Sequence, residues 1–337
     1  MEIRQNYDLT KLNTFGITAR AKFFLEVSTE DELKKLFAEP VFKNNPRLFL
    51  GGGSNLLFTR DFDGLVVQNR LKGIEIIEEN SEHALVRAMG GEIWHDLVLF
   101  AIEHGLWGIE NLSSIPGSVG AAPVQNIGAY GAELREVLYS IEALDIEAGE
   151  KKVFTNDSYA GGYRESIFKN ELKGKYFITA VTLKLSKIPK KNLSYKSLRE
   201  YLGARGVRDP SLQEISAAVT EIRKEKLPDP RFIANAGSFF KNVFVDEAKL
   251  AELLKVYPSM PYFKVGEGIK IPSAWLIEEC SWKGKRMGDA GVYERHALVL
   301  VNHGKATGEE IKKLSDEIIA SVREKFGIEL SPEVNFI

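Results

Sequence analysis

Hydrophobic and polar residues recur with two different periods along the chain, and these periods predict a mixture of strands and helices. Short apolar or alternating runs predict strands, and the run at 177–185 alternates as a strand with one buried face does. The predicted strands cover residues 22–27, 47–50, 64–68, 83–88, 137–146, 177–185 and 297–301.

Apolar residues at helical spacing predict a helix over 91–105, where Ile93, Leu97 and Ala101 recur every four residues and Gly105 follows the end. Residues 271–279 resemble another helix.

Three more helices begin at a Ser or Thr that is followed three residues later by Glu, the capping-box pattern. We expect the first to run to about Phe37 and to be closed by Pro40, and the last to end at Gly327. The three pairs are Thr29 with Glu32, Ser211 with Glu214, and Thr307 with Glu310.

Two glycine-rich segments interrupt these elements. A glycine triplet opens residues 51–56 directly after a predicted strand, which is compatible with a backbone cradle for phosphate or with an ordinary turn. Residues 113–131 are mostly small but contain interleaved Ile, Val and Ala, and they follow neither period. A flexible linker would lack those apolar residues. We therefore expect an ordered, buried path along which the backbone approaches a ligand closely.

A third segment, 235–242, follows two prolines that end the preceding helix. It presents the hydroxyl of Ser238 beside two aromatic residues and Lys241. This arrangement fits either an ordinary turn before a strand or part of an active site, and the segment alone does not decide between them.

Composition narrows the class of protein. The 337 residues, 44% of them hydrophobic, suffice for two or three domains with sizeable cores. A net charge of -2 does not indicate a nucleic-acid or membrane partner. The single cysteine, Cys280, excludes an internal disulfide. Without an N-terminal signal segment or a run of ~18 apolar residues, we expect a soluble, cytoplasmic protein.

Several catalytic signatures are incomplete. Leu56 stands where the dinucleotide fingerprint requires glycine, and Pro116 stands where a nucleophile elbow requires glycine. No Gly-Lys pair completes a Walker loop. His95 and His104 lack metal-binding spacing, so we expect both to be structural.

Seven segments, in order along the chain, together resemble the UDP-N-acetylenolpyruvoylglucosamine reductase family, whose members make UDP-N-acetylmuramate for bacterial peptidoglycan. The loop around Tyr195 is similar to that of the family's first type, in which a tyrosine closes over the substrate. The seven segments are 13–16, 51–56, 115–120, 125–131, 163–166, 235–242 and 332–334.

The resemblance implies an α+β fold with an FAD-binding module of the vanillyl-alcohol oxidase type. Its two subdomains would span 1–68 and 69–224. A smaller α/β substrate-binding domain would span 225–327, and residues 328–337 would return near the active site.

The resemblance also implies non-covalently bound FAD, with NADPH as the hydride donor. The cofactor-binding residues carried over by matching motifs are Gly51, Gly52, Gly53, Ser54, Asn55, Leu56, Ser114, Ile115, Pro116, Gly117, Gly120 and Ile178.

In the family's reaction, reduction of an enol ether places negative charge on the substrate carboxylate. By resemblance, Arg164 stabilises that charge, Glu333 stabilises the enol, and Ser238 is the general acid. A serine hydroxyl is a weak acid, so this role requires a strongly basic carbon next to it.

The resemblance implies a UDP-sugar enolpyruvyl ether as the substrate, bound by a set of mainly polar residues, and a monomeric protein without nucleic-acid or membrane partners. His296 departs from the family, which often has glutamine there, while Arg223 and Arg231 fit either ligand binding or a solvated face. Another FAD-dependent oxidase and a non-catalytic sugar-nucleotide-binding protein remain alternatives. The substrate residues are Tyr195, Lys226, Asn242, Tyr262, Lys283 and His296.

Overall fold

The computed structural model describes residues 1–266 and 268–337, and the chain forms two compact units. Unit 1 comprises Met1–Tyr7, Ala21–Gly53 and Asp63–Glu225, and unit 2 comprises Asp8–Arg20, Ser54–Phe62 and Lys226–Ile337. Two short early segments therefore belong with the C-terminal part of the chain. The second of them begins inside the glycine-rich loop 51–56.

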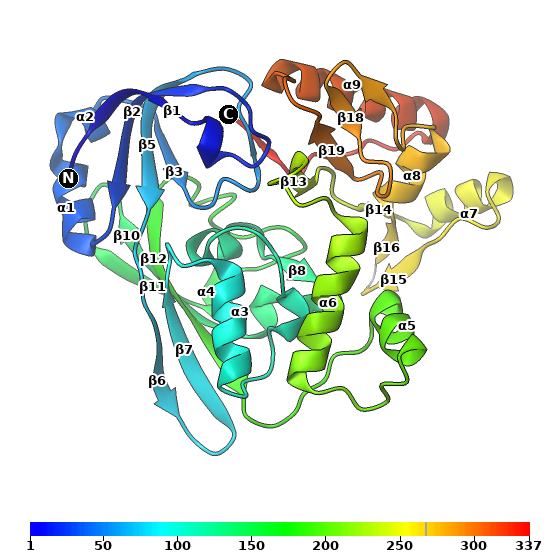
Figure 1. Cartoon of the computed structure of the whole chain (residues 1–337), viewed down its shortest axis with the longest axis horizontal. Helices are drawn as coiled ribbons and strands as arrows, with labels where there is room; N and C mark the ends of the chain where they lie inside the picture. Colours follow the sequence, from blue (N-terminus) through cyan, green and yellow to red (C-terminus); the bar gives the residue numbers. More distant parts are fainter. Residues whose placement is uncertain (267) are drawn as a thin grey trace. The chain divides into compact units, whose positions relative to one another are not determined.

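The first sheet of unit 1 has the strand order β1-β2-β5-β3 (Figure 1). Thr29 and Glu32 form the predicted capping box at the start of α1. Pro40 does not only close that helix, because it is also the first residue of the short helix α2. Proline fits a first helical turn, where its missing N–H has no partner to lose. The elements are β1 (Arg4–Asp8), β2 (Arg20–Val27), α1 (Glu30–Ala38), α2 (Pro40–Lys43), β3 (Arg47–Leu50) and β5 (Phe62–Asn69).

The second sheet of unit 1 is antiparallel, with the order β11-β10-β12-β7-β6. Its central strand β12 is buried along most of its length, so the prediction of one buried face was wrong. Phe177 packs with residues of the first sheet, whereas Val181 packs in a second hydrophobic cluster. The strands are β6 (Ile74–Glu79), β7 (His83–Met89), β10 (Leu138–Asp145), β11 (Lys151–Thr155) and β12 (Tyr176–Ser186).

Helices α3 and α6 contribute to that second cluster. The predicted buried face of α3 was Ile93, Leu97 and Ala101. Leu97 and Ala101 are buried, but Ile93 precedes the helix and is 50% exposed, and Trp94 is buried in its place. The Trp94 indole donates to Leu112 O over 3.0 Å, which holds the start of segment 113–131 against α3. The helices are α3 (Trp94–Glu103), α4 (Asn156–Tyr159), α5 (Lys196–Ala204) and α6 (Leu212–Lys226).

Segment 113–131 is only partly buried: residues 118–120, 122–123 and 126–127 are buried, most of the others are half-buried, and Pro116, Ala121 and Gly131 are exposed. Its irregular period has a structural cause, since it contains a 3-10 helix with Pro123 inside it. The short elements of this region are 3-10 helices at Glu110–Leu112, Val119–Gln125 and Leu134–Glu136, and strands β8 (Gly128–Ala129) and β9 (Ala132–Glu133).

Unit 2 is built on an antiparallel sheet with the order β13-β19-β18-β17, which packs against α9. Thr307 and Glu310 cap α9 as predicted, and Gly327 ends it with φ +63°. The predicted helix at 271–279 begins two residues later, because Ile271 is the last residue of β16. The elements are β13 (Ala234–Ser238), α8 (Ser273–Glu279), β17 (Arg286–Met287), β18 (Ala290–Val292), β19 (Val299–Asn302) and α9 (Gly308–Phe326).

A smaller sheet of unit 2 has the order β14-β16-β15, and the C-terminal strand β20 pairs in parallel with β4. None of the helices in the described residues is long and apolar enough to cross a membrane. The remaining elements are a 3-10 turn (Thr10–Leu12), β4 (Leu56–Leu57), β14 (Val243–Val245), α7 (Glu247–Val256), β15 (Phe263–Val265), β16 (Gly268–Ile271) and β20 (Asn335–Phe336).

Candidate active site

The predicted cofactor glycines of unit 1 meet where two backbones pass closely. A methyl group on Gly51 would lie less than 3.0 Å from Ser118 Oγ, and one on Gly52 would lie 3.1 Å from Gly117 Cα. Neither position tolerates a larger residue without movement of its neighbour. The glycines of loop 51–53 and the turn at Gly117 are therefore brought together, as expected for one shared binding surface.

This close packing continues along the sheet. Gly120 donates its N–H to Gly90 O over 2.8 Å, and Gly90 donates to Thr179 O over 2.7 Å. A methyl group on Gly90 would lie 2.7 Å from Ile178 O. Gly120 and Ile178, two further predicted cofactor residues, thus both lie close to Gly90.

Two buried polar atoms beside this surface have no hydrogen-bond partner in the described residues: Ser118 Oγ and Gln68 Oε1. Gln68 pairs with Leu50, directly before Gly51, in the β3-β5 ladder. Unpaired buried polar atoms are costly, so they point to a partner supplied by a ligand. Bare backbone with a hydroxyl and an amide beside it fits a cofactor that carries phosphates and a polar ring system, such as FAD.

Sequence reasoning did not single out either residue. Ser118 lies inside a recognised motif, whereas Gln68 carries no signal in the sequence beyond its place at the end of a strand.

The second half of the glycine loop belongs to unit 2. Asn55 donates from Nδ2 to Glu333 O over 3.2 Å, and its carbonyl accepts the N–H of Asn335 over 3.1 Å. Leu56 pairs with Asn335 in the β4-β20 ladder. The predicted cofactor residues 54–56 are thus held by the C-terminal segment.

The predicted catalytic residues Ser238 and Glu333 are close neighbours in unit 2. Glu333 donates its backbone N–H to Phe239 O over 2.7 Å, and Phe240 forms a β-bridge with Pro332. Segment 235–238 is the end of strand β13 and not a turn before a strand; Gly237, with φ +72°, lies where the pairing of β13 with β19 is irregular, directly before Ser238. Ser238 and Glu333 are far apart in the sequence, and the pairing of Glu333 with Phe239 brings their backbone segments together.

Arg164, the third predicted catalytic residue, lies in unit 1 with φ +56° and donates from Nη2 to Gly128 O over 2.7 Å. The positive charge of Arg223 is close enough to act on both Arg164 and Tyr130. Two guanidinium groups in one region favour an anionic ligand such as a carboxylate or phosphate. Arg223 is therefore more than a solvated charge.

Two tyrosines accompany these arginines. The rings of Tyr130 and Tyr195 meet edge to face with centroids 5.2 Å apart. Burial raises the pKa of Tyr130 to about 12 and also raises the pKa of Tyr195. Both phenols are therefore neutral hydrogen-bond donors at physiological pH. Tyr195 immediately precedes α5, at the end of the predicted loop.

Three predicted substrate residues of unit 2 form one charge cluster. Burial lowers the pKa of His296, and the charges of Lys226 and Lys283 lower it further while Glu278 raises it. Lys283 pairs with Glu278 over 3.0 Å. His296 Nδ1 accepts the N–H of Leu298 over 3.2 Å, so the neutral ring carries its proton on Nε2 and can donate to a ligand.

The other two predicted substrate residues have different surroundings. Asn242 Oδ1 accepts the N–H of Ser273 over 3.1 Å, so this side chain supports the start of α8. Tyr262 is 41% exposed and directly precedes β15.

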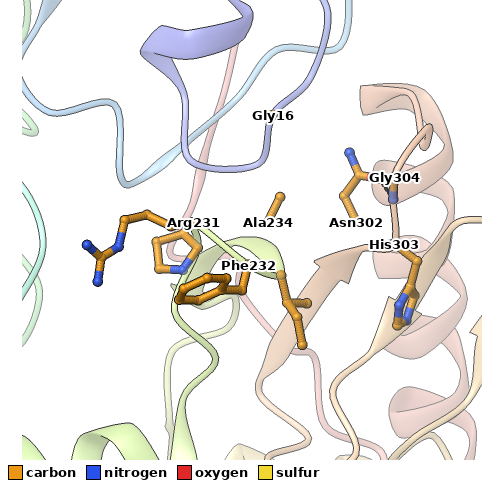
Figure 2. Close-up of a pocket in the computed structure, with 9 residues that line it drawn as sticks. Gly16, Arg231, Phe232, Ala234, Asn302, His303 and Gly304 are labelled. Carbon is orange, nitrogen blue, oxygen red and sulfur yellow. Dashed lines mark hydrogen bonds between the residues drawn. The ribbon is translucent and has the colours of Figure 1, made fainter.

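A separate pocket of unit 2, with a volume of about 250 Å³, contains none of these residues among those that line it. Figure 2 shows Arg231 pointing away from Asn302 and His303 across this pocket. Arg231 pairs with Asp229, and the Asn302 amide is bonded to backbone groups such as Phe15 O. Arg231 and Asn302 are thus already paired, and the predicted site residues lie outside this pocket. In the described part of the chain, no group of His, Cys, Asp and Glu residues could hold a metal ion.

Comparisons with known proteins identify the family of the chain. Residues 229–337 match the C-terminal domain of UDP-N-acetylenolpyruvoylglucosamine reductase, and residues 21–153 match an FAD binding domain. The reductase of Flavobacterium johnsoniae is 48% identical, with both chains covered in full. That of Chromobacterium violaceum is 44% identical over 99% of this chain and 98% of its own length.

The crystal structure of the reductase from Thermus caldophilus resembles this chain with a TM-score of 0.69 at 23% identity, covering 99% of this chain and 98% of its own. This likeness and the FAD binding domain confirm the predicted α+β fold class. Because the similarity to the two bacterial reductases extends over full length, the chain belongs to the UDP-N-acetylenolpyruvoylglucosamine reductase family.

Proposed function

We propose that this protein reduces UDP-N-acetylglucosamine enolpyruvate to UDP-N-acetylmuramate, a step of bacterial peptidoglycan synthesis, with FAD bound non-covalently and NADPH as reductant. Membership of the family makes the protein an FAD-dependent oxidoreductase. The observation that supports the residue assignment is the backbone pairing of Phe239 with Glu333, which brings the segment that carries Ser238 next to the C-terminal segment that carries Glu333.

The chemistry that FAD supplies when bound is two-electron transfer between a nicotinamide and the enolpyruvyl double bond. The protein must bind the negative charge that then develops on the substrate carboxylate. Arg164 takes this role, because a preorganised cation stabilises charge where it forms. Ser238 Oγ donates a proton to the carbon that bears the carboxylate, and the Glu333 carboxyl stabilises the enol form.

The nucleotide end of the substrate carries a pyrophosphate. Lys226 and Lys283 supply positive charge for it, and neutral His296 donates from Nε2. Tyr195 covers the substrate from its loop before α5 and donates through its neutral phenol. Asn242 and Tyr262 complete this set.

We further propose the division of labour that the family implies. Residues 1–68 and 69–224 form two FAD-binding subdomains, and residues 225–327 form the substrate-binding domain. One boundary between the compact units, at Glu225 and Lys226, supports the last division. The protein acts as a cytoplasmic monomer on a small-molecule substrate.

Ser238→Ala tests the proton-donor role in anaerobic half-reactions. Bleaching of the flavin absorbance by NADPH should stay within about twofold of wild type, while recovery of the absorbance with the enolpyruvyl sugar nucleotide should slow by roughly 10²- to 10⁴-fold. Ser259→Ala, at an exposed serine of the same unit, is the matched control. Equal slowing of both half-reactions would show that Ser238 is not the proton donor.

The same preparation separates the alternative functions. A protein that stays colourless after incubation with FAD is a sugar-nucleotide-binding protein without redox chemistry. Rapid consumption of O₂ with another substrate, and no NADPH oxidation with the sugar nucleotide, would identify an oxidase.

A further inference from the structure

Ser114 has a backbone conformation that non-glycine residues rarely adopt, with φ +57°. Three side chains hold it there. Its N–H donates to His95 Nδ1 over 3.1 Å, its hydroxyl bonds to Thr220 Oγ1 over 3.0 Å, and its carbonyl accepts from Arg223 Nε over 3.2 Å. A strained residue persists only where its surroundings fix it, and such residues cluster at functional sites.

Helix α6 supplies two of the three side chains that hold Ser114, those of Thr220 and Arg223. Ser216, Thr220 and Arg223 are spaced four and three residues apart, so they share one face of the helix. Ser216 bonds to the neighbouring Ser113 hydroxyl over 2.7 Å. The bonds that join Ser114 to Thr220 and Arg223 lie further along the same face of α6.

Helix α3 supplies the third side chain, that of His95, and holds both ends of the turn 114–117. Trp94, its first residue, donates its N–H to Gly117 O over 3.0 Å. His95, its second residue, accepts from Ser114 N. Gly117 is the residue that packs against Gly52. The start of α3 is thus the support on which the cofactor-binding turn is shaped.

The hydrogen bond from Ser114 fixes the state of the His95 ring. An imidazole nitrogen that accepts an N–H carries no proton, so the ring is neutral with its proton on Nε2. A doubly protonated ring would present a second donor to the Ser114 N–H, and the bond would be lost.

We propose that His95 is a positioning residue of the cofactor site: as a neutral acceptor it holds Ser114, and through it the turn 114–117, in the conformation that binds FAD. This inference rests on the proposed function in taking FAD as the ligand. His95 itself need not touch the cofactor. This role could not be predicted from the sequence, because the hydrogen-bond partner of His95 is a backbone N–H at a residue with positive φ.

The charges that face His95 keep the ring neutral. Burial lowers its pKa below the ordinary 6.5, Arg223 on α6 lowers it further, and Asp96 on α3 opposes this shift. The acceptor is therefore present at neutral pH and is lost as the pH falls through the lowered pKa. FAD affinity should fall in the same range.

The test compares His95→Asn with His95→Leu, because an asparagine Oδ1 occupies nearly the place of Nδ1 and does not titrate, whereas leucine removes the acceptor. The dissociation constant of FAD for the apoprotein is measured from pH 8 to pH 5 by quenching of FAD fluorescence. Wild type should bind about tenfold more weakly at the acid end, the cost of one unsatisfied buried N–H. His95→Asn should bind tightly at every pH, and His95→Leu weakly at every pH.

His104→Asn is the matched control, because His104 follows the other end of α3 and bonds to Phe100 O within its own helix. The inference is wrong if wild type and His95→Asn show the same pH dependence, or if His95→Leu binds FAD as tightly as wild type. Should His95→Leu fail to fold, the comparison of wild type with His95→Asn still decides. Wild-type protein that binds no FAD even at pH 8 would instead overturn the proposed function.

Discussion

Replacing Gly51 with alanine should destabilise unit 1 through one identifiable clash. The new methyl group would lie less than 3.0 Å from Ser118 Oγ, while Ser118 Cβ and Ala121 Cβ would be at 3.3 and 3.5 Å. Only the hydroxyl is too close for a real contact to persist. Ser118→Ala removes that hydroxyl and leaves two tolerable distances, so the second mutation should rescue the first.

Gly51→Ala should lower the free energy of unfolding, whereas Ser118→Ala should leave it unchanged or raise it. Overpacking of this kind costs about 1–3 kcal/mol of the free energy of unfolding. Ser118→Ala alone should be neutral or stabilising in the apoprotein, because the hydroxyl is buried with no hydrogen-bond partner in the described residues. The double variant should then recover ~1–2 kcal/mol relative to the sum of the single variants, the coupling expected of residues in direct contact.

Wild type, the two single variants and the double variant form a double-mutant cycle. Urea unfolding of the four apoproteins measures their free energies of unfolding. Gly203→Ala is the control for the alanine itself, since a methyl group there meets nothing within 4 Å and lies in helix α5. It should stabilise by ~0.5–1 kcal/mol and add independently to Ser118→Ala. Additivity of Gly51→Ala with Ser118→Ala within about 0.5 kcal/mol would refute the close approach of the two backbones.

Three further outcomes are expected. Glu333→Gln should lower turnover at least ~100-fold and leave FAD affinity unchanged; loss of bound flavin would instead make Glu333 a structural residue. Lys283→Ala should raise the KM for the sugar nucleotide about tenfold, whereas Lys264→Ala, at an exposed ion pair, should not. Glu142 has its pKa lowered chiefly by the hydrogen bond from Arg87. The stability that it contributes is therefore present above pH 4.5 and lost on acidification, and Glu142→Gln should flatten this loss in urea titrations.

The sequence predicted best those features that are set by neighbouring residues. The capping boxes at Thr29 and Thr307 depend on a hydroxyl and a carboxylate three residues apart, and both helices begin there. Strands β6 and β11 were missed because they lie at the edges of their sheet, where much of each strand is exposed and the apolar signal is weak. The burial of β12 on both faces depends on what packs against it, which the alternation of its residues does not encode.

Motif order identified the candidate residues of the site but not the contacts that shape it. Gly51 and Ser118 are far apart in the sequence, and neither residue type indicates that the two would be in contact. His95 was expected to be structural because it lacks metal-binding spacing, a test that says nothing about a backbone N–H as its partner. Arg223 could be read as a solvated charge until its bond to Ser114 O placed it beside the cofactor turn.

Residues 54–62 belong to unit 2, so the second half of the glycine loop is held by contacts within that unit. A methyl group on Gly308, the first residue of α9, would overlap Phe58 O. Segment 54–62 therefore contacts the start of α9 so closely that only glycine fits at position 308. Thr59 then donates to Ile337 O, and Asn55 donates to Glu333 O over 3.2 Å. The residues that position Glu333 therefore belong to the loop expected to bind the cofactor. Asn55→Ala should for this reason slow the half-reaction with the enolpyruvyl sugar nucleotide, in which Glu333 acts, and also weaken FAD binding, as anaerobic half-reactions and FAD titration would measure.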